Sequence, residues 1–274
     1  MECALDRDTR GRLTKDGIRI YDPSDFARMH TAGRLAAEIL DAMSAHVFPG
    51  QTTGAIDKII TDLVEAAGAT SATIGYKGYQ HASCISVNHV VCHGIPGDKV
   101  LKDGDILNID VTVIVDGWFG DTSRMFVAGK LPRKAERLIE VTHDSLMRGI
   151  EAVKPGNTFG DIGHAIQSFV EAHRMSVVRD FCGHGLGRVF HAPPNVLHYG
   201  RQGTGAVLEP GMFFTIEPMV NLGRPETKTL ADDWTAVTRD KSLSAQFEHS
   251  VGVTEDGCEI FTLSPAGTFH PTYG

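Results

Sequence analysis

Residues 106–126 read ILNIDVTVIVDGWFGDTSRMF, two apolar, β-branched runs separated by an Asp-Gly pair at 116–117. Asp-Gly accepts the positive φ angles of a two-residue turn, so the stretch predicts a hairpin of two long antiparallel strands. That turn pairs Asp121 with Thr112, which makes Asp110 and Asp121 diagonal neighbours on one face, roughly 7–8 Å apart. Two carboxylates in apolar strands repel each other and are costly to bury unless a cation lies between them. The hairpin therefore predicts a metal site.

An internal repeat indicates two related halves. Residues 49–66 read PGQTTGAIDKIITDLVEA and residues 155–172 read PGNTFGDIGHAIQSFVEA, with nine of 18 positions identical at an offset of 106. Each copy predicts a turn followed by an amphipathic helix, and each follows an earlier helical segment, at about 24–47 and about 132–153. The alternative is that two helices converged after Pro-Gly turns, but so many identities in so short a run favour duplication.

The order of the elements predicts the fold class. A strand-rich region follows each copy of the repeat, although residues 221–244 are polar and irregular. Helix, helix, strands, repeated once, predicts an α+β fold whose halves share an antiparallel sheet with helices packed on its outer face. We expect a single domain at 20–274, with halves at about 20–130 and 131–265. Residues 1–19 would be an N-terminal extension, either flexible or in contact with a partner.

Composition narrows the class of protein. A chain of 274 residues can bury a sizeable core, and its net charge of −8 argues against a nucleic-acid-binding surface. Five cysteines without a CxxC pair indicate reduced thiols rather than a disulfide framework. The charged N-terminus lacks the apolar core of a secretory signal, and no run approaches the roughly 18 apolar residues of a membrane span. We expect a cytoplasmic protein with no nucleic-acid specificity and no membrane attachment.

Three further segments carry metal-binding side chains. CGHGLG holds His184 between glycines, TIEP ends an apolar run with Glu217, and the alternation in SAQFEHS puts Glu248 on its polar face. Taken singly, His184 is better explained as a loop histidine, and Glu248 is equally well a solvent-side carboxylate. With Asp110 and Asp121, however, they make four carboxylates and one imidazole, which suit two hard or borderline divalent ions better than a thiolate-rich structural zinc. Two such ions can share a hydroxide and make it a nucleophile near neutral pH.

Two more histidines stand in similar contexts. His93 lies in VCHGIP and His191 in VFHAPP, each followed closely by proline and each at a corresponding place after its repeat. Neutral imidazoles beside a dinuclear site can hold a substrate carbonyl or donate a hydrogen bond to a developing oxyanion. The alternative is that one or both are loop histidines with satisfied hydrogen bonds.

Several of these segments resemble the bacterial type I methionine aminopeptidases over about residues 20–265. The matching stretches include NIDVTVIVDGWFGDTSRMF, CGHGLGRVFH, FTIEPMV and SLSAQFEHSVGVTEDGCEI. The resemblance implies the pita-bread fold, whose pseudo-twofold symmetry agrees with the repeat. It also implies a metalloaminopeptidase that hydrolyses the N-terminal methionine from nascent proteins with a small second residue, through a hydroxide bridging two metals. Those metals would belong to the Co, Mn, Fe, Zn or Ni class.

The resemblance also assigns roles to the residues. It implies that Asp110 chelates one metal, that Asp121 and Glu248 bridge the two, and that His184 and Glu217 ligate the other.

The same likeness implies that Glu217 is the general base, that His191 contacts the scissile carbonyl, and that His93 lies near the substrate amide. The methionine pocket would be lined by Tyr76, Tyr79, Cys84, Phe190 and Trp234, with His93 at its edge. A monovalent-cation site for Na⁺ or K⁺ would correspond to Asn88, Val90 and Ser244.

Two departures from the common bacterial pattern stand out: Ala192-Pro193 after His191, where acidic residues are frequent, and the extension at 1–19. The family suggests a monomer, with the ribosome as a candidate partner. Two alternatives stay open, an Xaa-Pro aminopeptidase of the same fold and a non-catalytic pita-bread binding protein.

Overall fold

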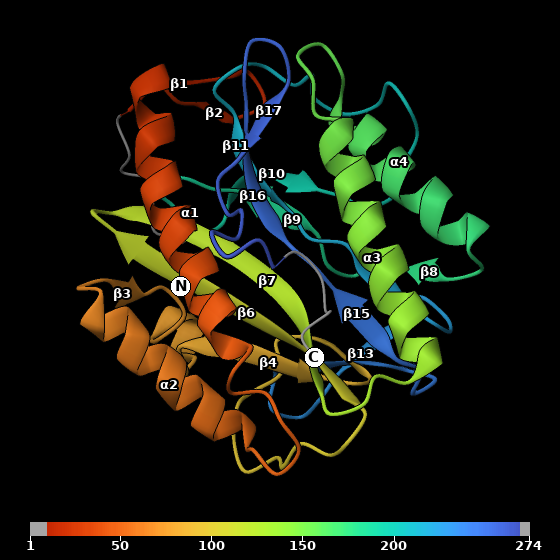
Figure 1. Ribbon diagram of the computed structural model, residues 1–274. Coiled ribbons are helices and arrows are strands. Elements are labelled where there is room, and N and C mark those ends of the chain that lie inside the picture. Colours follow the sequence, from red (N-terminus) through yellow and green to blue (C-terminus); the bar gives the residue numbers. More distant parts are fainter. Residues whose placement is uncertain (1–9, 269–274) are drawn as a thin grey trace.

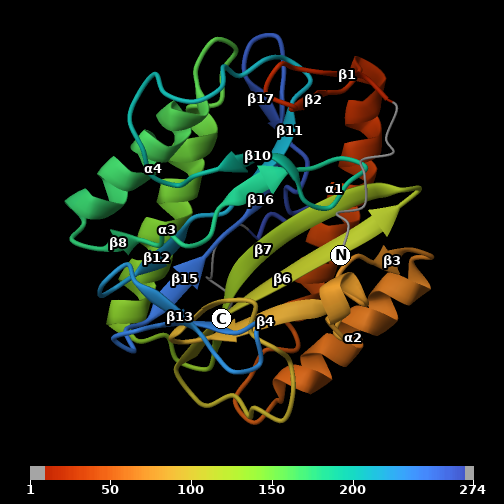
Figure 2. The same cartoon turned by 180° about the vertical axis from the view of Figure 1, so that it is seen from behind.

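The computed structural model describes residues 10–268. Its helices lie on one side of the strands: they run in front of them in Figure 1, and the strands face the viewer in Figure 2. The expected α+β class, with helices on the outer face of antiparallel sheets, is confirmed. The helices are α1 (Pro23–Met43), α2 (Thr53–Ala66), α3 (Arg133–Glu151) and α4 (Phe159–Ala172), with a 3-10 turn at Tyr76–Gly78.

The strands pair in antiparallel fashion throughout the described residues. They form several short sheets rather than one continuous sheet. In chain order they are β1 (Arg12–Leu13), β2 (Arg19–Ile20), β3 (Thr70–Ser71), β4 (Ser83–Val87), β5 (Val90–Cys92), β6 (Asp105–Val115), β7 (Trp118–Ala128), β8 (Ser176–Val177), β9 (Gly183–Gly185), β10 (Ala192–Val196), β11 (Phe213–Ile216), β12 (Met219–Asn221), β13 (Thr227–Thr229), β14 (Ala236–Thr238), β15 (Ser244–Gln246), β16 (His249–Val253) and β17 (Cys258–Ile260).

The hairpin of β6 and β7 has the predicted turn and register. Asp116 has φ 50° and Gly117 has φ 79°, which are the two positive angles of a type I′ turn. Thr112 pairs with Asp121, and the ladder continues without a break from the turn to the far ends of both strands. Because side chains alternate along each strand, this register puts Asp110 and Asp121 on the same face, as the sequence predicted.

The duplicated segments form two matching units, which we call frames: residues 49–66 with 100–101, and residues 155–172 with 207–208. The helices α2 and α4 begin at equivalent positions, and the residue before each, Thr52 or Thr158, makes an isolated bridge to Val100 or Val207. The backbone repeats in detail: Gly50 and Gly156, 106 residues apart, donate to the carbonyls of Leu101 and Leu208 at 2.8 and 3.1 Å. Two segments that merely converged on amphipathic helices would not share these hydrogen bonds between their loops, so the structure supports duplication.

The strands that follow the frames are related as well. Residues 100–110 read VLKDGDILNID and residues 207–217 read VLEPGMFFTIE, which align at an offset of 107. The first stretch runs into β6 and the second into β11, so Asp110 and Glu217 occupy equivalent places in the two halves.

Each half has its own core. One cluster joins α1 and α2 to β4, β6 and β7, with Leu40, Ile60 and Ile109 fully buried. The other joins α3 and α4 to the second set of strands, and it also takes in Ile106 and Met125 from the hairpin. The hairpin therefore packs on both cores and connects the halves.

Helix α1 lies unusually close to β7. A Cβ at Gly120 of β7 would come within 2.2 Å of the carbonyl oxygen of Ala32 in α1. On the helix, a Cβ at Gly33 would come within 2.4 Å of the carbonyl oxygen of Phe261, which follows β17. Only glycine allows the backbones to approach so closely at these two positions.

The first described residues form a hairpin, β1 with β2, that packs against the second half. Ile20 bridges to Met212, Arg12 pairs with Glu209 at 2.7 Å, and Tyr21 accepts a hydrogen bond from the amide of Arg188. Residues 1–9 of the expected extension lie outside the described part of the chain.

Candidate active site

A cavity of about 750 Å³ lies between the two halves. It is lined by all five residues expected to hold metals, by both expected catalytic histidines and by the five expected pocket residues. The three residues expected to bind a monovalent cation do not line it. Its expected lining residues are Tyr76, Tyr79, Cys84, His93, Asp110, Asp121, His184, Phe190, His191, Glu217, Trp234 and Glu248.

The first half contributes Asp110 and Asp121 from the β6–β7 hairpin. Asp121 is 4% exposed, and one of its carboxylate oxygens accepts a hydrogen bond from Thr112 at 2.7 Å. Because Thr112 is its cross-strand partner, the hydroxyl fixes the carboxylate while leaving the other oxygen toward the cavity. Asp110 stands opposite Cys84 of β4, so the same face continues onto the neighbouring strand.

The second half contributes the other three candidates. His184 lies in β9 beside β11, Glu217 directly follows β11, and Glu248 lies between β15 and β16. An isolated bridge from Glu248 to Ser123 joins this half to the hairpin, with the amide of Glu248 donating to the Ser123 carbonyl at 3.0 Å. The site is thus completed by a direct backbone contact between the halves.

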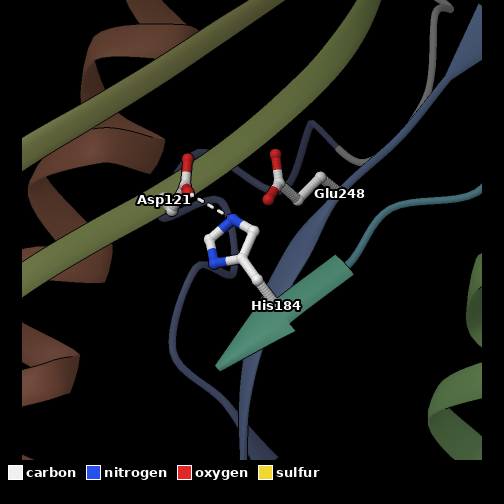
Figure 3. A group of neighbouring side chains, drawn as sticks. All are labelled: Asp121, His184 and Glu248. Atoms are coloured by element: carbon white, nitrogen blue, oxygen red, sulfur yellow. Dashed lines mark ion pairs between the residues drawn. The ribbon is translucent and has the colours of Figure 1, made fainter. Parts of the chain in front are cut away.

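Three of these side chains converge on one point. Figure 3 shows Asp121, His184 and Glu248 pointing toward one another, with ligand atoms that all lie within 4.8 Å of each other. His184 Nε2 lies 3.5 Å from an Asp121 oxygen and 3.7 Å from a Glu217 oxygen. Thr215 donates to Glu217 at 2.8 Å and accepts from the amide of His184 at 3.0 Å, which fixes these two residues relative to each other.

The electrostatics of this cluster call for positive charge. Burial raises the pKa of Asp110 and Glu248 well above the usual range, and repulsion from neighbouring carboxylates, Asp121 above all, adds to it. Burial likewise raises the pKa of Glu217 to about 7. Burial alone would lower the pKa of His184, but the hydrogen bond to Asp121 and the charge of Glu217 outweigh it and raise the pKa. Carboxylates this close that resist ionisation suit a site that a bound cation stabilises.

Divalent metal fits the donor set. The converging atoms are carboxylate oxygens and one imidazole nitrogen, which hard and borderline divalent ions prefer. Four cysteines lie within the described residues and all are free thiols, Cys84 and Cys92 being buried. Burial raises the pKa of both thiols.

The two histidines flank the carboxylate cluster. His191 lies against His184, with ring centroids 4.2 Å apart, and stacks on Tyr76 at 5.1 Å. Burial and the neighbouring His184 lower the pKa of His191 to about 3, so the ring is neutral. Burial and Lys77 also lower the pKa of His93, whose backbone has φ 55°, a conformation uncommon outside glycine.

Aromatic rings form the wall beside the histidines. Tyr79 packs against Trp234 at 4.9 Å between ring centroids, and Tyr76 packs against Phe190 at the same distance. Cys84, 6% exposed, adds its sulfur to this wall.

The residues expected at a monovalent-cation site lie together outside the cavity. The carbonyl of Asn88, whose φ is 57°, accepts a hydrogen bond from the amide of Ser244 at 2.9 Å. Val90 begins β5, two residues further along the chain.

Sequence reasoning did not assign four residues that contact the site. Thr112 and Thr215 hold ligand candidates, Gln246 donates to Glu217 at 3.3 Å from the cavity wall, and buried His198 accepts from the Glu217 amide at 3.0 Å. The pairing register already identified Thr112, and the alternation of SAQFEHS pointed to Gln246. His198 and Thr215 carried no comparable signal.

Comparison with known proteins is consistent with this geometry. The profile of metallopeptidase family M24 matches residues 27–255. The chain therefore belongs to metallopeptidase family M24. It is 56% identical over 257 residues to the methionine aminopeptidase of Rickettsia prowazekii, covering 93% of this chain and 99% of that protein. It is also 56% identical over 248 residues to the Escherichia coli K12 methionine aminopeptidase, covering 90% and 94%. Within the family, the chain is a methionine aminopeptidase.

Solved structures agree. The crystal structure of the Rickettsia prowazekii methionine aminopeptidase matches with a TM-score of 0.89 and 57% identity, covering 90% of this chain and 100% of that one. The Thermotoga maritima methionine aminopeptidase matches with a TM-score of 0.87 and 39% identity, covering 89% and 99%. The Pyrococcus horikoshii prolidase, at 20% identity and a TM-score of 0.71, shares the fold over 89% of this chain and 63% of its own.

Among the described residues, no helix is both long and apolar enough to span a membrane.

Proposed function

We propose that this methionine aminopeptidase acts through two divalent metal ions held by Asp110, Asp121, His184, Glu217 and Glu248. The observation that carries the proposal is the gathering of four carboxylates and one imidazole, each buried or half-buried, around a single cavity, where burial and mutual repulsion raise the pKa of three of the carboxyl groups. When bound, two such ions would polarise the substrate carbonyl and lower the pKa of a shared water.

The ligand roles follow from the two halves. Asp110 would serve one ion and His184 with Glu217 the other. Asp121 and Glu248 would bridge, because both belong to the converging group and each carboxylate has two oxygens, whereas the third member, His184, would offer one nitrogen. Any of the Co, Mn, Fe, Zn or Ni class suits these mixed oxygen and nitrogen donors.

Three residues would handle substrate and protons. Glu217 would accept a proton at a carboxylate oxygen and return it to the leaving amine. His191 is neutral, so its N–H would donate to the oxygen of the scissile carbonyl as negative charge develops there. His93 would hold the amide nitrogen of the same bond.

The aromatic wall would take the methionine side chain. Rings and a sulfur suit a flexible, polarizable thioether, because sulfur–aromatic contacts are favourable in addition to burial. The residues proposed to line this pocket are Tyr76, Tyr79, Cys84, Phe190 and Trp234, with His93 at the edge.

We infer that the second substrate residue is small. His93 packs edge-on against Phe181, with ring centroids 5.5 Å apart, and both rings line the cavity. If His93 holds the amide nitrogen, Phe181 would limit the space for the second side chain. The substrates would be the N-termini of nascent proteins, which a monomer would process at or near the ribosome.

A monovalent ion, Na⁺ or K⁺, held by oxygens of Asn88, Val90 and Ser244 would stabilise the neighbouring strands.

A peptide-release assay across the divalent metals, with bound metal counted, tests the proposal. We expect methionine release from Met-Ala-Ser, about two metal ions per chain at full activity, and no cleavage of Ala-Pro peptides. Cleavage of Ala-Pro peptides would instead favour an Xaa-Pro aminopeptidase. A protein that binds no divalent metal and stays inactive with added Co²⁺, Mn²⁺ or Fe²⁺ would be a non-catalytic member of the fold.

A further inference from the structure

The loop between β3 and β4, residues 72–82, carries two of the residues that line the cavity. Tyr76 and Tyr79 lie in it, and the loop ends at Ser83, the first residue of β4. Tyr79 is 3% exposed, and its hydroxyl donates to the carbonyl of Ser83 at 2.9 Å. The position of the Tyr79 ring therefore depends on where Ser83 is held.

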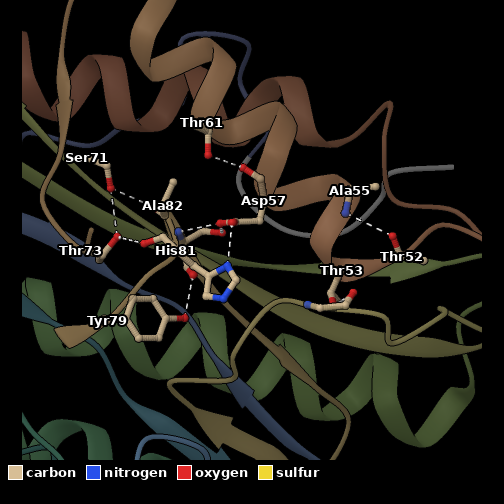
Figure 4. Close-up of polar contacts among 12 residues, drawn as sticks. Thr52, Thr53, Ala55, Asp57, Thr61, Ser71, Thr73, Tyr79, His81 and Ala82 are labelled. Atoms are coloured by element: carbon tan, nitrogen blue, oxygen red, sulfur yellow. Dashed lines mark hydrogen bonds and ion pairs between the residues drawn. The ribbon is translucent and has the colours of Figure 1, made fainter. Parts of the chain in front are cut away.

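Ser83 is held by a carboxylate from a helix. One oxygen of Asp57, in α2, accepts hydrogen bonds from the amide of Ser83 at 2.9 Å and from its hydroxyl at 2.7 Å. The other oxygen lies 3.1 Å from Nδ1 of His81. Figure 4 shows Asp57 reaching from the helix toward His81, beside the bond made by the Tyr79 hydroxyl. Both oxygens of one buried carboxylate thus fix the end of the loop.

The strands also hold the loop: the amide of Ala72 donates to the carbonyl of Thr112 at 3.0 Å, and the Tyr79 hydroxyl lies 3.5 Å from the carbonyl of Gly94. The side-chain hydrogen bonds between the two ends of the loop are local. Thr73 donates to the carbonyl of His81 at 2.7 Å, and Ser71 contacts Thr73 at 3.0 Å and the carbonyl of Ala82 at 3.4 Å. These bonds close the loop on itself, but they do not connect it to the helix layer. Within the described residues, the polar contacts between this loop end and α2 run through Asp57.

By holding Ser83, Asp57 also affects the position of Cys84, whose sulfur lies beside the aromatic rings of the cavity. Ser83 pairs with Val111, and the next residue, Cys84, pairs with Asp110. Since Ser83 is 0% exposed and Asp57 is 7% exposed, water cannot readily replace the carboxylate. Loss of Asp57 would leave buried donors unpaired, and they would draw the loop end toward new partners.

We propose that Asp57 is a positioning residue that sets the width of the substrate side-chain pocket by holding Ser83, and through it Tyr79 and Cys84. It touches neither the substrate nor the proposed metal ligands. The proposal rests on the proposed function, because it concerns the pocket for the side chain that is removed. Asp57 would thereby contribute to selection of methionine over other side chains.

The test compares side-chain selectivity in Asp57→Asn, Asp57→Ala and Ser83→Ala. Each is assayed for kcat/KM on Met-Ala-Ser, norleucine-Ala-Ser and Leu-Ala-Ser at full metal loading. The ratio of kcat/KM for methionine over leucine is independent of the fraction of folded enzyme, because both substrates are measured in one preparation. Asp62→Asn is the matched control, since Asp62 lies in the same helix but is exposed and pairs with Lys58 on the surface.

We expect the methionine-to-leucine ratio to fall about fivefold or more in Asp57→Ala, mainly through KM. A whole methylene in an apolar pocket is worth roughly 10- to 200-fold, and a displaced ring should cost less. Asp57→Asn keeps an oxygen for Ser83 and should lose less, and Ser83→Ala, which keeps the backbone donor, should lie between wild type and Asp57→Ala. Bound metal should be unchanged in all of them.

Unchanged ratios in both Asp57 variants, with lower thermal stability alone, would overturn the proposal and leave Asp57 a structural residue. Loss of bound metal would also overturn it, because the effect would then act on the ligands. If wild-type enzyme itself released no methionine, the proposed function would fail instead, so the two failures are distinguishable.

Discussion

His191 provides the sharpest test at the scale of one residue. Its ring is neutral and lies against His184, a proposed metal ligand, while the proposed role of His191 is to contact the substrate carbonyl. We expect His191→Ala to lower kcat at least about tenfold, because a donor to the developing oxyanion is lost. Metal content should stay at the wild-type level.

The measurements are kcat on Met-Ala-Ser and metal counted by mass spectrometry. His164→Ala is a suitable control, since His164 lies on α4 and contacts Ser168 on the same helix. Reduced metal occupancy in His191→Ala would show that this histidine has been given the wrong role.

Residue contacts also set the limit of what the sequence could predict. Asp121 and its partner Thr112 followed from the turn and the alternation, since both are local and periodic. Asp57 contacts Ser83 across 26 residues, and His198 contacts Glu217 across 19. Neither contact follows from a periodic pattern in the sequence, so the sequence alone does not predict it. Such supporting residues become visible only once the fold brings them together.

At the scale of elements, α1 is tied to β7 and to the C-terminal segment by a buried ion pair. Arg124 of β7 donates to Asp41 of α1 at 2.7 Å, and Ser264 donates to the same carboxylate at 2.7 Å. Burial alone would raise the pKa of Asp41, but hydrogen bonds from Thr268, Ser264 and Arg124 together outweigh it, and the pKa is lowered.

This lowered pKa gives a pH dependence with a definite sign. A carboxyl whose pKa is depressed in the folded state stabilises the protein above its unfolded pKa, about 4, and loses that contribution as the pH falls through the folded pKa. We expect Asp41→Asn to melt below wild type at pH 7, and the two melting temperatures to converge below about pH 4. A gap that stays constant from pH 7 to pH 3 would show that the charge of Asp41 is unimportant.

The close approach of α1 to β7 gives a second prediction for elements. A methyl group at Gly120 would overlap the Ala32 carbonyl, and backbone on both sides must move to accommodate it. We expect Gly120→Ala to lower the free energy of unfolding by about 1–3 kcal/mol or more. Gly257→Ala is the control, because a Cβ there meets nothing within 4 Å. Urea denaturation of both variants measures the difference, and equal stabilities would contradict the proposed crowding.

Elements differ in how well the sequence predicted them. The two repeat helices and the hairpin were predicted because each has a strong period and a recognisable start or turn. The segment at 221–244 read as irregular, yet it contains β13 and β14, and β14 pairs with β5. Strands of three residues are too short to show alternation, and their pairing partner lies far away in the chain.

At the scale of the whole molecule, we expect the described residues, 10–268, to unfold as one unit. The two cores share the β6–β7 hairpin, since Ile106 and Met125 belong to the second cluster while Leu107 and Phe126 belong to the first. The proposed ligands also come from both halves. Disruption of either half should therefore remove contacts from the other.

Metal removal tests whether the two halves unfold together. Divalent metal that binds the folded state alone should stabilise it by about 2.7 kcal/mol at 100 times the dissociation constant. For a chain of this size we expect a rise of very roughly 5–10 °C in melting temperature. Chelated and reloaded protein should each melt in one transition by circular dichroism and by tryptophan fluorescence. Two separate transitions, or no shift on reloading, would contradict a metal site shared between halves.

The repeated frames around α2 and α4 have a consequence for how the site is assembled. Because both frames belong to one chain, the second half meets the first at an effective concentration set by the connecting segment rather than by the cell. Assembly is then unimolecular and independent of protein concentration. In a single chain the two halves need not have the same sequence, as two identical subunits must. Each half could therefore diverge, which is consistent with an aspartate at 110 and a glutamate at the equivalent position, 217.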